Sequence, residues 1–217
     1  MKWLSGARVD GVRELVQQER ADLLAFLETL TPNEWEAPSL CSGWQVRDVV
    51  AHVVIYDSFR LTHVWQLIRS GFSGDRLNVR TAEAWRGRSP TELLDCLRAN
   101  LIPGGITRLF GWPTALQEAT VHHQDVRRPL SRPRNIPLER IERVLANMID
   151  APVLAGLPNH AKGIRLEATD IDWRTGEGPL VTGTGEAIMM ALAGRPQVLQ
   201  ELTGAGVDLL RARLDAT

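Results

Sequence analysis

Two stretches, WQVRDVVAH at residues 44–52 and EATVHHQDVRR at residues 118–128, are predicted to form the two central helices of the protein. The rest of the chain is expected to support the site that they carry. Glu118 and His122 are four residues apart, so on a helix they lie on one face, about one turn from each other. His52 falls on the apolar face of the other helix. If the two helices pack side by side, the three side chains form an open site for a divalent metal ion, most simply zinc. Spacing alone leaves two alternatives to a metal site open: His52 is a histidine packed in the core, and Glu118 faces solvent.

The composition is that of a soluble globular protein. The chain has 217 residues, 44% hydrophobic and 24% charged, which suits one large domain or a medium domain with a small one. Its net charge of -1 argues against nucleic-acid or membrane-surface partners. The two cysteines, Cys41 and Cys96, are too few for a disulfide framework or a cysteine-based zinc site. We see no signal peptide and no apolar run long enough to span a bilayer, and therefore expect a cytoplasmic protein, monomeric or homodimeric.

Apolar periodicity predicts a helical first part of the chain. Helices are expected over residues 8–30, 45–70, 113–128 and 138–150, with another that starts at Ser89 and continues through Leu101. TPNE at 31–34 and SPTE at 89–92 are predicted capping boxes. In such a box, the side chain of the Thr or Ser accepts a hydrogen bond from the backbone N–H of the Glu, and the Glu side chain accepts one from the backbone N–H of the Thr or Ser. In the first helix, the charged residues Arg13, Glu14, Glu19 and Arg20 are expected on the face opposite the apolar one.

The pattern changes after Pro152. Residues 164–170 alternate in hydrophobicity as a strand does, and residues 180–183 read as a second short strand after a glycine turn. Residues 186–193 and 197–202 look helical. The predicted fold class is therefore mainly α, with a helical bundle over residues 1–150 and a small α+β domain over residues 151–217.

The motifs resemble those of a known family. LCSGWQVRDVVAH at residues 40–52 resembles the Cys-x-Gly-Trp to His segment of the mycothiol-dependent maleylpyruvate isomerase family, whose members are DinB-like four-helix bundles. VHHQDVRR at 121–128 resembles the second signature of the family, most closely that of an actinobacterial branch labelled only as metal-binding. ATDIDW at 168–173 and ALAGR at 191–195 resemble its small C-terminal domain. Gln45 and Gln124 depart from the commonest residues of these motifs.

The resemblance implies that His52, Glu118 and His122 bind a divalent metal, with zinc expected, and that mycothiol is the thiol co-substrate. A thiol on such a metal is deprotonated and becomes a nucleophile. The expected activity is S-transfer to, or isomerisation of, a small electrophilic substrate. Two alternatives stay open: a hydrolase that uses a metal-bound water, and a non-catalytic bundle that binds a small molecule.

Further residues are candidates for the site. Asp48 either orients the imidazole of His52 or favours the N-terminus of its helix through the dipole. Tyr56 faces the substrate pocket or packs in the core, and Arg195 holds a substrate carboxylate or follows a helix end. His123 points about 100° away from His122 and is not expected to be a ligand. Asp125 is expected to form a surface pair with a neighbouring arginine.

Overall fold

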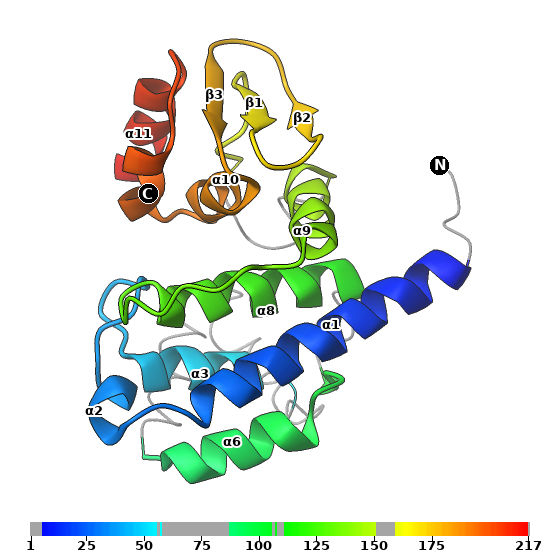
Figure 1. Ribbon diagram of the computed structural model, residues 1–217, viewed down its shortest axis with the longest axis vertical. Helices are drawn as coiled ribbons and strands as arrows, with labels where there is room; N and C mark the ends of the chain where they lie inside the picture. Colours follow the sequence, from blue (N-terminus) through cyan, green and yellow to red (C-terminus); the bar gives the residue numbers. More distant parts are fainter. Residues whose placement is uncertain are drawn as a thin grey trace, which may run out of the picture. The chain divides into compact units, whose positions relative to one another are not determined.

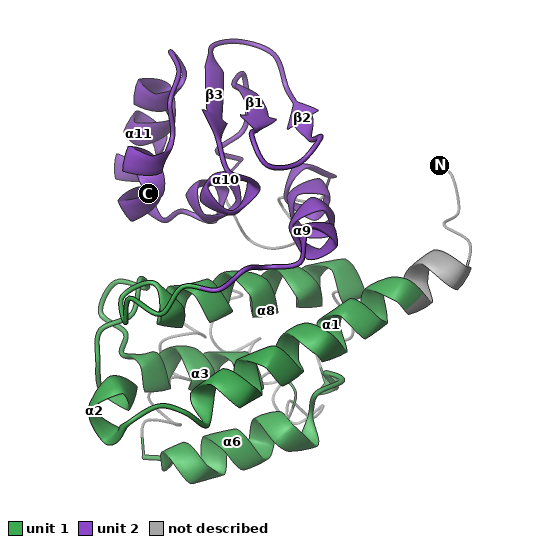
Figure 2. Cartoon of the chain, in the orientation of Figure 1, with its two compact units in different colours: residues 1–133 green, residues 134–217 purple. Residues whose placement is uncertain are grey.

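The structure is a computed structural model that describes residues 6–55, 57, 87–105, 107, 111–150 and 159–216, of which residues 6–10 are described by their backbone only. The chain divides into two compact units, Met1–Pro133 (unit 1) and Arg134–Thr217 (unit 2) (Figure 2). This division differs from the predicted boundary at residue 150. The helix before that residue, α9 (Leu138–Asp150), groups with unit 2 because it packs on another helix of that unit, α10 (Gly185–Leu192).

Unit 1 is a helical bundle (Figure 1). Its four main described helices are α1 (Gly6–Leu27), α3 (Val46–Ile55), α6 (Pro90–Ala99) and α8 (Trp112–Arg127). Helix α1 packs on α6 and α8, and α3 packs on the same two, so the four helices close a ring of contacts. The predicted four-helix bundle is confirmed.

Both predicted capping boxes are present in unit 1. The Thr31 hydroxyl accepts from the Glu34 backbone N–H at 3.3 Å, and the Glu34 carboxylate accepts from the Thr31 N–H at 2.8 Å, which starts the short helix α2 (Pro32–Trp35). Ser89 and Glu92 repeat this arrangement at the start of α6, with distances of 3.3 and 2.8 Å. A cap of this kind stabilises a helix by about 1 kcal/mol.

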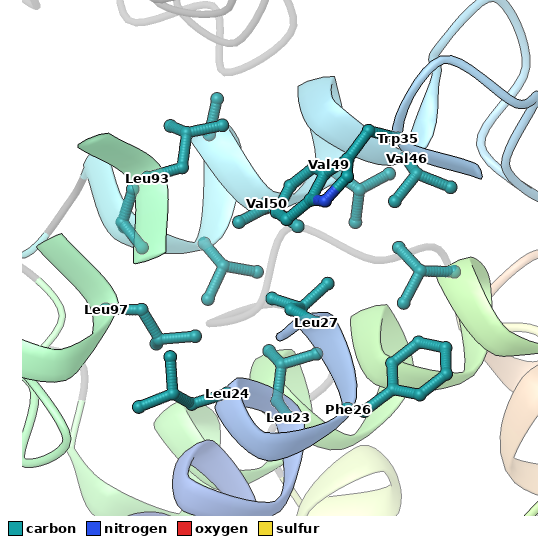
Figure 3. Packing of buried hydrophobic residues seen from close by; sticks show 14 residues of the cluster. Leu23, Leu24, Phe26, Leu27, Trp35, Val46, Val49, Val50, Leu93 and Leu97 are labelled. Carbon is teal, nitrogen blue, oxygen red and sulfur yellow. The ribbon is translucent and has the colours of Figure 1, made fainter. Parts of the chain in front are cut away.

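The apolar core of unit 1 joins α1, α2, α3 and α6 (Figure 3). Leu23 and Leu27 of α1 meet Leu93 and Leu97 of α6, and all four are at most 1% exposed. Helix α3 contributes the almost inaccessible valines Val46, Val49, Val50 and Val54. Because valine is a modest helix former, burial of this face, more than propensity, holds α3 helical.

Two charged residues of α1 are not where we expected them. Glu19 is 0% exposed and Arg20 is 2% exposed, so the prediction that both lie on the solvent face was wrong. Each has a buried partner: Glu19 contacts His123 of α8, and Arg20 forms an ion pair with Asp57. A buried charge is tolerated when it is paired, and a helix pattern does not show partners that are distant in sequence.

Unit 2 combines a small sheet with helices. Besides α9 and α10, its elements are β1 (Arg165–Ala168), β2 (Arg174–Thr175), β3 (Leu180–Gly183), the 3₁₀ helix η1 (Pro196–Glu201) and α11 (Val207–Asp215). The strand order is β2-β1-β3, with β1 antiparallel to β2 and parallel to β3. Gly185 lets α9 approach α10, because a Cβ atom there would lie 2.7 Å from Ile141 Cγ2. The predicted α+β character of this part is confirmed. Among the described residues, no helix has the length and apolarity of a membrane span.

Candidate metal centre

The side chains of His52, Glu118 and His122 converge in unit 1, as predicted. Glu118 Oε2 lies 3.3 Å from His122 Nε2 and 3.8 Å from His52 Nε2. The two imidazole rings meet edge to face, with centroids 4.9 Å apart. One potential ligand atom from each residue lies within 4.8 Å of the other two. Two separate helices therefore present a carboxylate and two imidazoles to one point.

These residues fit a divalent metal in number, chemistry and spacing. Zinc binds imidazole nitrogen and carboxylate oxygen at about 2.0–2.2 Å, so two ligands of a tetrahedral site lie roughly 3.4 Å apart. The distances of 3.3 and 3.8 Å from Glu118 Oε2 are close to that spacing. Two imidazoles with one carboxylate suit zinc and other first-row metals. Three protein ligands leave coordination positions for another molecule, as in catalytic sites.

A tight turn at residues 41–44 fastens the loop before α3 onto α8. Trp44 N–H donates to the Cys41 carbonyl at 3.0 Å, and Gly43 supplies the positive φ of 75° that this turn requires. The backbone N–H of Leu40 donates to the Asp125 carbonyl at 3.0 Å. The Cys-Ser-Gly-Trp sequence therefore sets where α3 begins relative to α8, and the Trp44 ring lies 5.2 Å from that of His52.

Asp125 is a site residue that the sequence analysis missed. It is 0% exposed, and its Oδ2 lies 2.8 Å from His122 Nδ1 and 3.2 Å from Cys41 Sγ, which donates to it. The expected surface pair with an arginine was therefore wrong. A carboxylate on Nδ1 fixes the ring orientation and leaves Nε2 for the cluster with Glu118. Its position three residues after His122, on the same helix face, was the available signal.

Cys41, His122 and Asp125 form a second group of potential ligand atoms. This group shares His122 with the first one, and it uses the opposite side of the imidazole. The two groups are best understood as one site with an inner cluster, His52, Glu118 and His122, and a supporting pair behind His122.

The charges of the metal-free cluster are strongly coupled. Burial alone would lower the pKa of His122, but hydrogen bonds with Asp125, Cys41 and Glu118 outweigh it and raise that pKa well above its usual value. Burial lowers the pKa of His52 despite the opposing effect of Glu118. Burial would raise the pKa of Glu118, but hydrogen bonds from both histidines lower it. In the absence of metal, the cluster therefore favours a proton on His122 over one on His52 or on Glu118.

A pocket opens beside the inner cluster. Its volume, counted together with the solvent at its mouth, is about 310 Å³, and its described lining includes the three inner residues with Arg20, Thr107 and small apolar residues of α3 and α8. The Arg20 side chain is 2% exposed and forms its ion pair with Asp57, whose side chain is 0% exposed. Burial lowers the pKa of Arg20 and raises that of Asp57, each against the effect of its partner.

The other predicted residues have different positions. Asp48 is 4% exposed and accepts a hydrogen bond from the Gln45 backbone N–H at 3.0 Å, so it stabilises the start of α3, one of its two expected roles. Its other expected role, to orient His52, stays a prediction. Tyr56 lies outside the described residues. Arg195 is in unit 2, where its guanidinium donates to the Ala193 carbonyl at 2.5 Å, and its role in binding substrate also stays a prediction.

His123 belongs to a separate buried contact between α1 and α8. Its Nδ1 lies 2.8 Å from Glu19 Oε1, and its Nε2 accepts from Arg127 Nε at 2.8 Å. The Arg127 guanidinium in turn lies 3.8 Å from the centre of the Phe26 ring. These contacts agree with the expectation that His123 is not a ligand, and they help to hold α8 in place.

The chain is similar to known proteins in one sequence segment and in its fold. Residues 16–102 match the family described as Mycothiol maleylpyruvate isomerase N-terminal domain. The crystal structure of the mycothiol-dependent maleylpyruvate isomerase H52A mutant has a TM-score of 0.62 at 16% sequence identity, and the match covers 91% of this chain and 92% of that one. Another crystal structure of mycothiol-dependent maleylpyruvate isomerase covers the same shares at 14% identity with a TM-score of 0.48.

At such identities, the likeness to the first of these structures shows the fold alone. No curated protein sequence matches the chain. The chain has the mainly helical fold with a small C-terminal sheet that this crystal structure has. The family likeness is carried by residues 16–102, which are similar to the Mycothiol maleylpyruvate isomerase N-terminal domain family.

Proposed function

We propose that this protein is a divalent-metal- and thiol-dependent S-transferase or isomerase that acts on a small electrophilic substrate, with zinc as the metal and mycothiol as the thiol. The observation that carries the proposal is the convergence of His52, Glu118 and His122 beside an open pocket. The matched family segment includes His52 but ends before Glu118 and His122, so the ligand role of these two residues rests on geometry.

In this proposal, His52, Glu118 and His122 hold the metal. A bound divalent cation would lower the pKa of a coordinating thiol, which makes the reactive thiolate available at neutral pH. Asp125 keeps the His122 ring oriented, and its own buried position is set by α8 and by the Cys41 thiol. Glu118 has a side chain that is 41% exposed, so the cluster can be reached from the pocket.

The rest of the pocket would receive the electrophile. The thiolate sulfur adds to an electrophilic carbon, and a proton supplied from solvent or a side chain completes the addition. Release at this stage is S-transfer. Rotation about the new single bond, followed by removal of a proton from the adjacent carbon and elimination of the thiolate, re-forms the double bond and is isomerisation. Tyr56 and Arg195 are proposed to contact substrate, and Asp48 to support His52.

The ligand assignment is tested by metal analysis of His52→Ala. We expect the purified wild type to retain about one zinc per chain after dialysis, and His52→Ala to retain almost none with unchanged circular dichroism. His160→Gln is the matched control, because His160 is a buried histidine of unit 2 that is outside the cluster, and it should keep its zinc. Stoichiometric zinc in His52→Ala would contradict the assignment.

The reaction class is tested by conjugation assays with mycothiol and a panel of small electrophiles. We expect turnover that requires both zinc and thiol. Turnover with zinc but without any thiol would instead indicate a hydrolase. Zinc binding with no turnover under either condition would favour a non-catalytic binding bundle.

A further inference from the structure

Arg20 has properties that neither the ligand cluster nor the bundle core explains. It is a 2%-exposed arginine of α1, yet its side chain is part of the lining of the pocket beside His52, Glu118 and His122. Its Nη2 donates to Asp57 Oδ2 in a short ion pair. Among the described residues, its buried Nε has no hydrogen-bond partner. A guanidinium has five N–H donors in a planar fork, so this ion pair leaves donor capacity unused.

A purely structural role accounts poorly for this arrangement. A buried ion pair contributes little net stability compared with apolar residues of similar volume, because desolvation of both charges offsets their attraction. The adjacent Glu19 is also buried, but it is bound to His123 and is not part of the described pocket lining. Of these two buried charges of α1, the one at the pocket is the one that retains an unused donor.

We infer that Arg20 is the anion-recognition residue of this pocket and that it binds a carboxylate of the small molecule that enters beside the ligand cluster. Asp57 holds the guanidinium in place and compensates its charge when the pocket is empty. The planar fork of an arginine matches the two oxygens of a carboxylate, whereas a neutral amide offers it one oxygen. The inference rests on the proposed function for the identity of the neighbouring cluster, but not for the binding of the anion.

The carboxylate could come from the thiol or from the electrophile, and isosteric acid and amide pairs distinguish these sources. 3-Mercaptopropionate and 3-mercaptopropionamide represent the thiol, and succinate and succinamide, added with 2-mercaptoethanol, represent the electrophile. Ligand-observed NMR titration of zinc-loaded wild type should show that, in at least one pair, the acid binds about ten- to a hundredfold more tightly than its amide. The pair that shows the preference identifies the source.

Variants connect this preference to Arg20. Arg20→Gln alone leaves Asp57 buried without its counter-charge, so Arg20→Gln with Asp57→Asn is the main variant, and folding is checked by circular dichroism. It should lose the preference for the acid. Arg20→Lys keeps the charge without the fork and should retain only a few-fold preference. Arg13→Gln removes an exposed arginine two turns earlier on α1 and should leave the preference unchanged.

The outcomes separate the inference from the proposed function. If wild type binds acids and amides equally, or if a folded double variant keeps the preference, the inference is overturned. If the double variant does not fold, Arg20→Lys decides, and a full wild-type preference in it overturns the inference. If wild type binds no zinc, the proposed function fails, and the same pairs are titrated on the metal-free protein. A preference there that requires Arg20 supports the inference, and its absence overturns it.

Discussion

At the scale of single residues, the site depends on the two nitrogens of His122. Nε2 lies 3.3 Å from Glu118, and Nδ1 lies 2.8 Å from Asp125. A buried carboxylate behind a ligating imidazole fixes the tautomer and makes the ring a better ligand. Asp48, for which the sequence left open a role in orienting His52 or at the helix start, accepts from the backbone N–H of Gln45 at the start of α3.

We therefore predict different effects for the two carboxylates. Asp125→Asn should weaken zinc binding about 10–100-fold, because the charge behind His122 is lost while the shape is kept. Asp48→Asn should lower the free energy of unfolding by about 0.5–1 kcal/mol through the helix dipole, with a much smaller loss of zinc affinity than Asp125→Asn. Competition with a chromophoric chelator measures the first quantity, and urea unfolding measures the second. The reverse pattern would show that Asp48 is the carboxylate that supports the site.

At the scale of elements, the turn at residues 41–44 positions the start of α3 relative to α8, and these are the two helices that carry the proposed ligands. Gly43 adopts a φ of 75°, a left-handed conformation in which a side chain is strained even though nothing lies within 4 Å of an added Cβ. Gly11 is also in open space, but it is inside the helix α1. The two glycines therefore differ in backbone conformation and not in available volume.

Substitution by alanine should act in opposite directions at these glycines. Gly43→Ala should lower the free energy of unfolding by about 1 kcal/mol, because L residues are strained at this φ. Gly11→Ala should raise it by about 0.5–1 kcal/mol, because glycine is a poor helix former. Urea denaturation of both variants with zinc removed measures the two changes. A Gly43→Ala variant as stable as wild type would show that the turn adopts another conformation.

At the scale of the whole molecule, the buried charges connect folding with pH and metal. The raised pKa of His122 means that the folded, zinc-free protein binds a proton there more tightly than the unfolded chain does. The lowered pKa of His52 and of His160 means the opposite for these two residues. The contributions of these histidines to the free energy of unfolding therefore change with pH in different ranges, on either side of about 6.5, the usual pKa of histidine.

We predict the following pH dependence. The stabilisation from His122 in zinc-free protein is fully present below about pH 6.5 and is lost as the pH rises through the higher folded pKa. Zinc replaces the His122 proton, so zinc affinity should rise through the same range, with release of about one proton per ion bound. Urea unfolding at pH 6.5, 7.5 and 8.5 in a chelator, for wild type and His122→Gln, measures the first effect.

Calorimetry in buffers of different ionisation enthalpy counts the released proton. Relative to His122→Gln, zinc-free wild type should lose stability between pH 6.5 and 8.5. A relative gain over this range, or zinc binding without proton release, would contradict a raised pKa for His122.

Much of this protein could be predicted from local sequence. The spacing of apolar residues predicted the bundle helices, Thr31 and Ser89 predicted two helix starts, and α9 begins and ends at the predicted residues. The pair Glu118 and His122 could be found because helix geometry alone brings residues four apart together. In each case, the interaction that decides the structure lies within about one helical turn.

The tertiary structure decided what depends on partners distant in sequence. The burial of Arg20 depends on Asp57, 37 residues away, and the burial of Glu19 depends on His123, 104 residues away. The sequence places Asp125 on the helix face of His122, but its burial is decided by Leu40 and Cys41, whose backbone N–H and thiol contact it. A charged side chain looks the same in a helix pattern whether it faces water or a buried counter-charge, because desolvation and pairing are set only when the helices pack.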